Sequence, residues 1–173
     1  MLSKYRFQSQ KFKLGMRTFK SGLAVFLVIL LFGQLGWKGV QIAALTAVFS
    51  LREDFDQSVH FGASRILGNS IGGFYALCFF LLEMGFQEAF WVRLVFVPVA
   101  VMLTIMTNVA MNNTAGIIGG VSALLIITLS IPNGHTLTYV FVRIFETFVG
   151  VFLAIVVNYD VDKLRNWIKK RTM

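Results

Sequence analysis

Two arginines stand near the start of long apolar runs, where a charged side chain is costly. Arg65 lies in SRILGNSIGGFYALCFF, and Arg143 lies 78 positions later in RIFETFVGVFLA. Cations inside membrane segments commonly mark the path of an ion or a substrate. The alternative is that both long side chains extend to the lipid headgroups. If they face the bundle interior instead, we expect them to hold anions at the two ends of one path.

Glu146 is the only acidic residue well inside a predicted span, and it follows Arg143 by three residues. Residues at this spacing are neighbours on a helix, so the sequence predicts an ion pair that an anionic substrate would compete to open. Arg65 has no such partner, because Gly68 stands at the equivalent position and Asn69 is its nearest polar neighbour. The interior is therefore net positive, which favours anions over cations.

A polar stretch, NVAMNNT, precedes the glycine-rich start of an apolar segment. The free N–H groups at a helix start can cradle a carboxylate, which makes Asn112 and Asn113, together with Asn69, candidate substrate ligands. The alternative for this stretch is a hydrogen-bonded turn at the membrane surface.

The sequence shows no sign of an enzyme. Glu53, Asp54, Asp56 and His60 are close in sequence, but their spacing fits no familiar set of metal ligands. There is no nucleophile with a base beside it, no phosphate-binding loop and no cofactor fingerprint. We therefore expect no catalytic residues, no metal and no cofactor.

The composition is that of an all-α integral membrane protein. Of the 173 residues, 57% are hydrophobic and 14% are charged, against about 25% charged in a soluble domain. The apolar runs are continuous rather than periodic, as in membrane-spanning helices. Eleven of the sixteen Lys and Arg residues lie at the two ends of the chain. This placement predicts cytoplasmic termini that contact anionic lipid, and it argues against nucleic acid as a partner.

Six spans are expected between two basic ends. A basic, interfacial N-terminal segment (1–20) precedes a six-helix transmembrane domain (21–158), and a basic amphipathic tail (159–173) follows it. An even number of spans returns the chain to the side where it began, which agrees with the two basic ends. The predicted spans are 21–35, 40–51, 61–82, 94–110, 115–131 and 137–158.

The 78-residue offset predicts two inverted three-helix repeats. Because three spans are an odd number, the two halves would cross the membrane in opposite directions, as in many transporters. Small residues at a spacing of four let helices approach closely in a membrane, so we expect Gly68, Gly72, Gly116 and Gly120 to be packing positions. The residues that recur in step are Arg65 and Arg143, Ile66 and Ile144, Gly72 and Gly150, Phe74 and Phe152, and Ala76 and Ala154.

The segments LGWKGVQIAALTAVFSLREDFDQSVHFGASRILGNSIGG and VRIFETFVGVFLAIVVNYD resemble the membrane domain of the aromatic acid exporter family, within the fusaric acid resistance-like group. The plant aluminium-activated malate channels resemble this group more distantly. The resemblance implies a six-helix membrane domain, export of aromatic or other organic carboxylates, and assembly into dimers or larger homo-oligomers. Longer members carry a soluble cytoplasmic domain after the sixth helix, so we expect this chain to be a minimal exporter or to work with a partner.

The sequence thus predicts a multi-pass protein of the inner or plasma membrane that exports small organic anions. No ATP-binding motif is present, so the membrane potential or a proton gradient is the expected driving force. A second hypothesis is a non-transporting membrane scaffold, or a subunit that depends on a partner protein.

Overall fold

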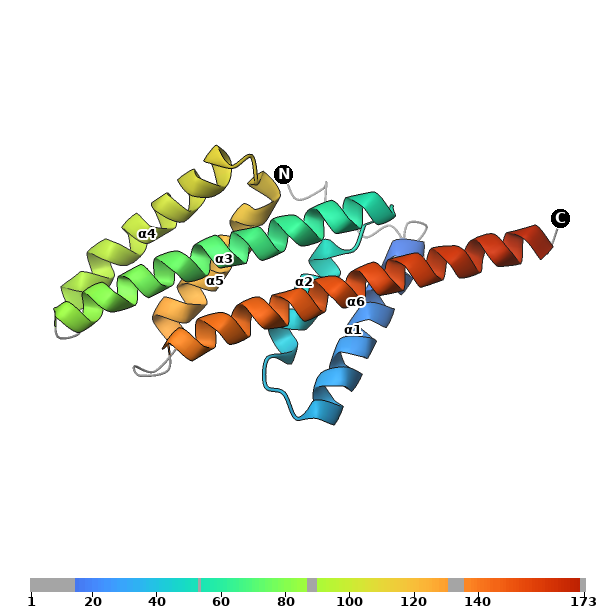
Figure 1. The fold of residues 1–173 in the computed structure, drawn as a ribbon, viewed down its shortest axis with the longest axis horizontal. Coiled ribbons are helices and arrows are strands. Elements are labelled where there is room, and N and C mark those ends of the chain that lie inside the picture. The colour runs from blue at the N-terminus through green and yellow to red at the C-terminus, as the bar shows by residue number, and fades with distance from the viewer. Residues whose placement is uncertain (1–14, 53, 87–89, 131–135, 172–173) are drawn as a thin grey trace, which may run out of the picture.

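The computed structural model is all-helical over the residues it describes, which are 15–52, 54–86, 90–130 and 136–171 (Figure 1). The predicted all-α fold is confirmed. Residues 1–14 of the predicted interfacial segment lie outside the described residues, as do the side chains of the predicted tail from residue 165 onward. The elements are α1 (Met16–Leu35), α2 (Val40–Ser50), α3 (Phe55–Gly85), α4 (Phe90–Ala110), the 3-10 turn η3 (Thr114–Gly116), α5 (Ile117–Ser130) and α6 (Thr136–Arg171).

Four of the helices are long and apolar enough to cross a membrane, namely α1, α3, α4 and the Thr138–Leu164 part of α6. The other two are shorter. With 11 residues in α2 and 14 in α5, they extend about 17 and 21 Å, against about 30 Å of hydrocarbon. The expectation of six helices therefore holds, but only four have the length of a full span. No break in α6 separates the predicted sixth span from the predicted tail.

Glycine and asparagine end two of the helices. Gly36 follows α1 in the left-handed conformation, with φ of 66°, and its N–H donates to the carbonyl of Phe32. This is the conformation that glycine adopts without strain at a helix C-terminus. Asn112 has φ of 54° after α4, and asparagine tolerates this region better than other side chains do. Both reversals are tight, so the short helices α2 and α5 start close to the helices before them.

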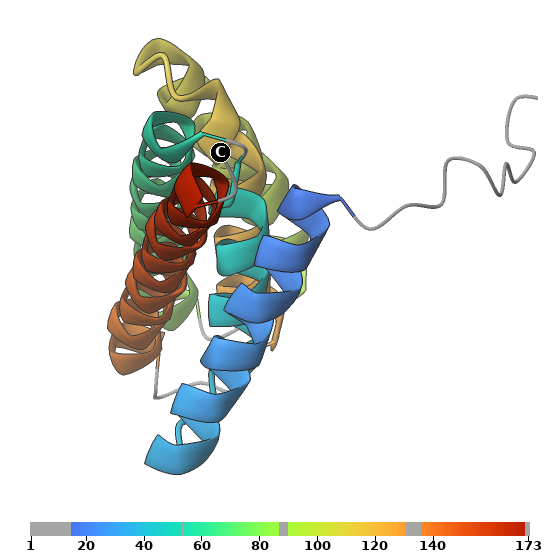
Figure 2. The ribbon, with the colours of Figure 1, turned by 90° about the vertical axis from the view of Figure 1, so that its right-hand side faces the viewer.

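The two long helices α3 and α6 lie side by side and run in opposite directions, and α2 and α5 lie on one side of this pair (Figures 1 and 2). The contacts follow a regular pattern. The short helix α5 packs on α3, and α2 packs on α6. The outer helix α4 contacts α3 and α5, while α1 contacts α2 and α6. The short helix of each half therefore packs against the long helix of the other half, and the first helix of each half lies on the outside.

The contact between α3 and α5 brings two backbones together. A Cβ atom added at Gly68 would collide with the carbonyl group of Gly116, and one added at Gly72 would collide with that of Gly120. The neighbouring atoms are backbone, so they cannot move aside as a flexible side chain can. Close approach of this kind maximises van der Waals contact, which is what holds helices together in lipid.

Small apolar side chains fill the space between the helices. One cluster joins α1, α2 and α6 and includes Ala24, Val28, Ala43 and Ala154, all of them fully buried. Most large apolar side chains point outward instead, as with Phe74 on α3, which is 60% exposed, while Phe32 and Phe79 are buried. A core of small residues under a surface of large apolar residues is expected where lipid, and not water, surrounds the bundle.

Candidate functional site

Arg143 is buried on α6, with 5% of its surface exposed. Its Nε and Nη1 groups have no hydrogen-bond partner. The side chain therefore lies inside the bundle and does not extend to the lipid headgroups. Buried donors without a partner are costly unless an anion or water reaches them, so Arg143 can still donate to a ligand.

Glu146 lies one turn further along α6 and is 7% exposed. Its carboxylate occupies the space in front of Gly39, where a Cβ atom would collide with it. The predicted ion pair with Arg143 is absent, because within the described part of the chain no carboxylate oxygen of Glu146 lies within 4.0 Å of that guanidinium. Glu146 points instead across the gap toward the α1–α2 turn, where glycine leaves room for it.

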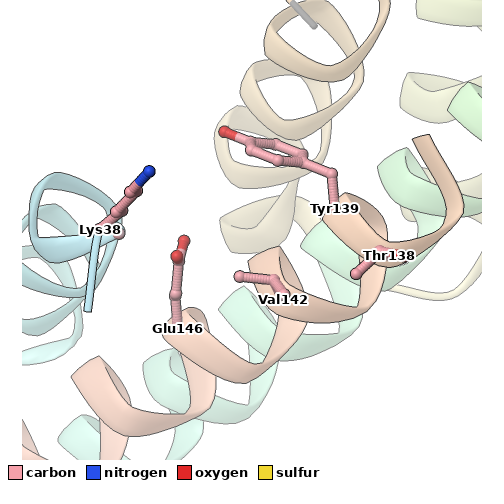
Figure 3. Close-up of a pocket in the computed structure, with 6 residues that line it drawn as sticks. Lys38, Thr138, Tyr139, Val142 and Glu146 are labelled. Carbon is pink, nitrogen blue, oxygen red and sulfur yellow. The ribbon is translucent and has the colours of Figure 1, made fainter. Parts of the chain in front are cut away.

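Two adjoining cavities of about 420 and 370 Å³ lie between the α1–α2 turn and the first turns of α6. Lys38, Val142 and Glu146 line both. Figure 3 shows Lys38 and Glu146 on opposite sides of the first cavity, with Tyr139 on the same helix as Glu146. The further lining residues are Gly39, Thr138 and Tyr139 in the first cavity, and Phe32, Gly36, Trp37 and Phe145 in the second. We call the two cavities together the α6 pocket.

The α6 pocket combines positive charge with an aromatic wall. Lys38 lines it, and Arg143 lies on α6 between the lining residues Val142 and Glu146. The ring of Trp37 packs edge-on against Phe32 at 5.4 Å and against Phe145 at 5.5 Å. Ring faces and edges of this kind bind planar apolar groups, and the two cations attract a negative head. The arrangement therefore suits an organic anion of small size.

Arg65 on α3 also contacts the interior helices. Its guanidinium carbon lies 4.5 Å from the ring centroid of Phe49 on α2. Its Nη1 lies close to Gly119 on α5, where an added Cβ would be 3.3 Å away. The side chain is partly buried and faces the two short helices, so its position resembles that of Arg143 more than that of a residue reaching for the headgroups.

Asn69 lies at the centre of the bundle, where α3 meets α6. Its Nδ2 donates to Thr147 Oγ1 at 2.6 Å, while its Oδ1 is buried without a partner. Thr147 in turn donates to the carbonyl of Arg143 at 2.9 Å. Asn69 is thus one helical turn from Arg65 on its own helix and is linked through Thr147 to the backbone of Arg143.

Asn112 and Asn113 lie at the α4–η3 turn, away from the α6 pocket. Asn113 is buried, and its Nδ2 donates to the carbonyl of Ser64 at 3.1 Å and to Asn108 Oδ1 at 2.8 Å. Asn112 is exposed. Because the amide donors of Asn113 are occupied within the protein, this stretch has the geometry of a hydrogen-bonded turn. A role for the two asparagines in substrate binding stays a prediction.

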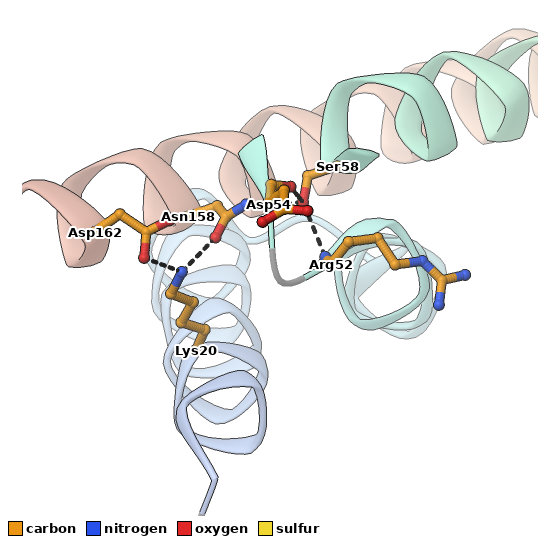
Figure 4. Close-up of polar contacts among 6 residues, drawn as sticks. All are labelled: Lys20, Arg52, Asp54, Ser58, Asn158 and Asp162. Atoms are coloured by element: carbon orange, nitrogen blue, oxygen red, sulfur yellow. Dashed lines mark hydrogen bonds and ion pairs between the residues drawn. The ribbon is translucent and has the colours of Figure 1, made fainter. Parts of the chain in front are cut away.

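A buried polar cluster, which we call the Lys20 cluster, joins α1, α3 and α6 (Figure 4). Lys20 is 2% exposed, and its Nζ donates to Asn158 Oδ1 at 2.6 Å and to Asp162 Oδ1 at 2.5 Å. Asn158 Nδ2 donates to Ser58 Oγ at 2.9 Å, and the backbone N–H of Arg52 donates to the same oxygen at 2.8 Å. The cluster fixes the end of the bundle opposite the α6 pocket.

Of the residues that line the α6 pocket, the sequence predicts only Glu146 as a site residue, and it gives no indication of the Lys20 cluster. Lys38 and Trp37 carry no such signal, because their approach to α6 depends on contacts between residues about a hundred positions apart. Lys20 was assigned to the basic flank, because nothing near it in sequence indicates burial. Among the described residues, no three His, Cys, Asp or Glu side chains come together as metal ligands, and Glu53 lies outside that part of the chain.

Comparison with known families agrees with the geometry. The family model described as aromatic acid exporter family member 1 matches residues 12–160. The chain belongs to the aromatic acid exporter family. Membership supports a membrane location and a general role in membrane transport, and exporters are not a class of enzyme. Neither a search of curated proteins nor a search of solved structures gave a significant match. A substrate of this family member would therefore have to match the α6 pocket and the positive charges of Lys38 and Arg143.

Proposed function

We propose that this protein exports small organic carboxylates, including aromatic ones, and that the α6 pocket holds the carboxylate near the outer face of the membrane. The observation that carries the proposal is Arg143, a buried guanidinium with two unused donors beside a pocket that also contains Lys38. A carboxylate bound there would accept those donors and compensate a charge that is costly to leave unpaired. The rings of Trp37 and Phe145 would contact the apolar body of the substrate.

We further propose that the two halves of the chain are inverted repeats with a two-fold axis between Asn69 and Thr147. These residues are 78 positions apart and bond to each other, and 78 is also the offset between Arg65 and Arg143. Equivalent residues of a two-fold pair touch only near the axis. The contacts of α2 with α6 and of α5 with α3 also support this relation.

On this proposal the two arginines lie at opposite ends of one path. Arg65 precedes Asn69 by four residues and Arg143 precedes Thr147 by four, on helices that run in opposite directions (Figure 1). Each arginine is therefore displaced about 6 Å from the axis, in opposite directions along the bundle. With both termini in the cytoplasm, Arg65 is the inner contact and Arg143 the outer contact.

The membrane potential suffices to drive export of a monovalent anion. Moving one negative charge out of a negative interior releases about 2.3 kcal/mol per 100 mV, which supports a concentration ratio of about 50-fold. If a proton gradient contributes, Glu146 is the carboxylate in the α6 pocket that would carry the proton.

The test uses purified protein in liposomes and radiolabelled benzoate, with the membrane potential set by a potassium gradient and valinomycin. We expect Arg143→Gln to reduce benzoate flux at least about 30-fold, because truncating a buried charged contact costs about 2 kcal/mol or more. Lys163→Gln is the matched control, since it also removes one positive charge but from an exposed site on α6.

Two outcomes would contradict the proposal. Flux within twofold of wild type in Arg143→Gln would remove Arg143 from the site. Wild-type liposomes inactive toward benzoate and a panel of other carboxylates would favour the scaffold hypothesis instead.

A further inference from the structure

A second group of cations lies at the end of the bundle opposite the α6 pocket. Arg17 is in the first turn of α1, Arg52 is in the α2–α3 connection, and Arg65 is in α3. The guanidinium of Arg52 stacks on Phe61, which lies one helical turn before Arg65 on α3, and the positive charge of Arg17 acts on Arg52. Exposure falls along the series, because Arg17 is exposed while Arg52 and Arg65 are partly buried. The three arginines, which we call the arginine series, lead from the surface into the bundle.

No carboxylate of the described residues neutralises this group. The ion pairs in that part of the chain are Lys20 with Asp162 and Glu83 with Arg93, and neither involves the arginine series. The Arg52 Nε is buried without a hydrogen-bond partner. Asp54 is close in sequence, but its carboxylate accepts a hydrogen bond from Gln57 Nε2 at 2.8 Å.

The position of Arg52 is fixed by its surroundings. Its backbone N–H donates to Ser58 in the Lys20 cluster, and its guanidinium points away from that cluster (Figure 4). The guanidinium carbon lies 3.7 Å from the ring centroid of Phe61, close enough for a cation–π contact. Burial and, to a smaller extent, the positive charge of Arg17 lower the pKa of the Arg52 guanidinium.

Stacking on Phe61 alone is an incomplete account of Arg52. A cation–π contact at a partly exposed site is weak, and repulsion from two neighbouring arginines opposes it. A carboxylate between Arg52 and Arg65 would relieve that repulsion and use the free Nε donor. The rings of Phe49 and Phe61 already stack on these guanidiniums, so an apolar body attached to the carboxylate would find aromatic surface on both sides.

We propose that Arg52 and Arg65 form the cytoplasmic binding site for the exported carboxylate, and that Arg17 attracts the anion to it. The ligand class is a carboxylate with a planar apolar body. This inference rests on the proposed function for the direction of transport, and it adds Arg52 and Arg17 to the residues that recognise the substrate. Long-range attraction by surface charge raises the rate of encounter and weakens with salt.

The transport experiment uses inside-out vesicles, whose cytoplasmic face is accessible, and varies the concentration of labelled benzoate. We expect Arg52→Gln to raise the half-saturating benzoate concentration about tenfold, with the maximal rate within twofold of wild type. Arg52→Lys keeps the charge and should stay within about threefold. Arg17→Gln should give a rise of about threefold that disappears at 0.5 M salt, because the Debye length there is only a few ångströms. Lys163→Gln is again the control and should change neither quantity.

A binding measurement separates this inference from the proposed function. Saturation-transfer NMR with benzoate and detergent-solubilised Arg143→Gln protein reports binding at the cytoplasmic site without transport. We expect a signal in Arg143→Gln, and we expect the Arg52→Gln, Arg143→Gln double variant to need an about tenfold higher benzoate concentration for the half-maximal signal, with both proteins eluting as the wild type does. A half-saturating concentration unchanged by Arg52→Gln in transport, or equal half-maximal concentrations in the two proteins, would overturn the inference even if wild-type protein transports benzoate.

Discussion

In the Lys20 cluster a second substitution is expected to restore stability that the first one removes, because the two charged members differ in their access to water. Lys20 is 2% exposed, whereas the side chain of Asp162 is 34% exposed. Asp162→Ala leaves a buried ammonium with only the neutral Asn158 as acceptor. Leaving one member of a buried ion pair without its partner costs about 3–5 kcal/mol in the free energy of unfolding.

Lys20→Met has a smaller expected cost. Methionine keeps most of the volume of the lysine stem, and the carboxylate of Asp162 can be solvated where it is exposed. The main loss is the donor to Asn158 Oδ1, and an unsatisfied buried acceptor costs about 1–3 kcal/mol. The Lys20→Met, Asp162→Ala double variant should then resemble Lys20→Met, because removing the lysine also removes the uncompensated charge. The second substitution would thus restore about 2 kcal/mol that Asp162→Ala loses.

The measurement is a double-mutant cycle on the free energy of unfolding, by steric trapping in bicelles or by reversible unfolding in detergent. Size-exclusion chromatography after heating to a series of temperatures gives the rank order of stability of the variants. A double variant less stable than Asp162→Ala alone, or an additive cycle, would refute the reasoning, since it would mean that Lys20 is not a buried charge held by Asp162.

Two glycines give further predictions. Gly39→Ala should displace the carboxylate of Glu146 and reduce benzoate flux several-fold. The free energy of unfolding should change by less than about 1 kcal/mol, because the colliding atoms are at the end of a flexible side chain. An unchanged flux would show that the position of the Glu146 carboxylate does not affect transport. Gly72→Ala should lower the free energy of unfolding by about 1–3 kcal/mol, because its Cβ meets the backbone of Gly120. Gly22→Ala is the control, since nothing lies within 4 Å of an added Cβ there, and it should be neutral or stabilising. Equal losses in Gly72→Ala and Gly22→Ala would contradict the packing argument.

The features that could be predicted from the sequence are those set by local composition and period. Continuous apolar runs predict helices in lipid, and the helices are found where those runs occur. The 78-residue offset identifies Arg65 and Arg143 as an equivalent pair, and both lie against neighbouring helices in the structure. The position of a residue along a helix can be predicted, because it depends on residues close in sequence.

Helix rotation and long-range contacts could not be predicted in the same way. Spacing alone predicts that Glu146 pairs with Arg143, but the carboxylate occupies the space in front of Gly39 in the α1–α2 turn instead. Lys38 reaches the same pocket from the α1–α2 turn for a reason equally distant in sequence. The shortness of α2 can be predicted from the sequence, because Lys38 and Arg52 bound its apolar run.

The contact between α3 and α5 also has a mechanical consequence. At Gly68 and Gly72 the two helices meet through backbone atoms, so no side chain between them can change rotamer to let one helix slide past the other. We expect this pair to behave as one stiff unit. The contacts of α6 with the α1–α2 turn are made by longer side chains, including Lys38, Phe145 and Glu146, around open space. The α2–α6 contact is also made through backbone atoms, because a Cβ atom added at Gly150 would collide with the carbonyl group of Ala43. Deformation during transport should therefore concentrate at the α1–α2 turn and the first turns of α6, while the α3–α5 contact stays rigid.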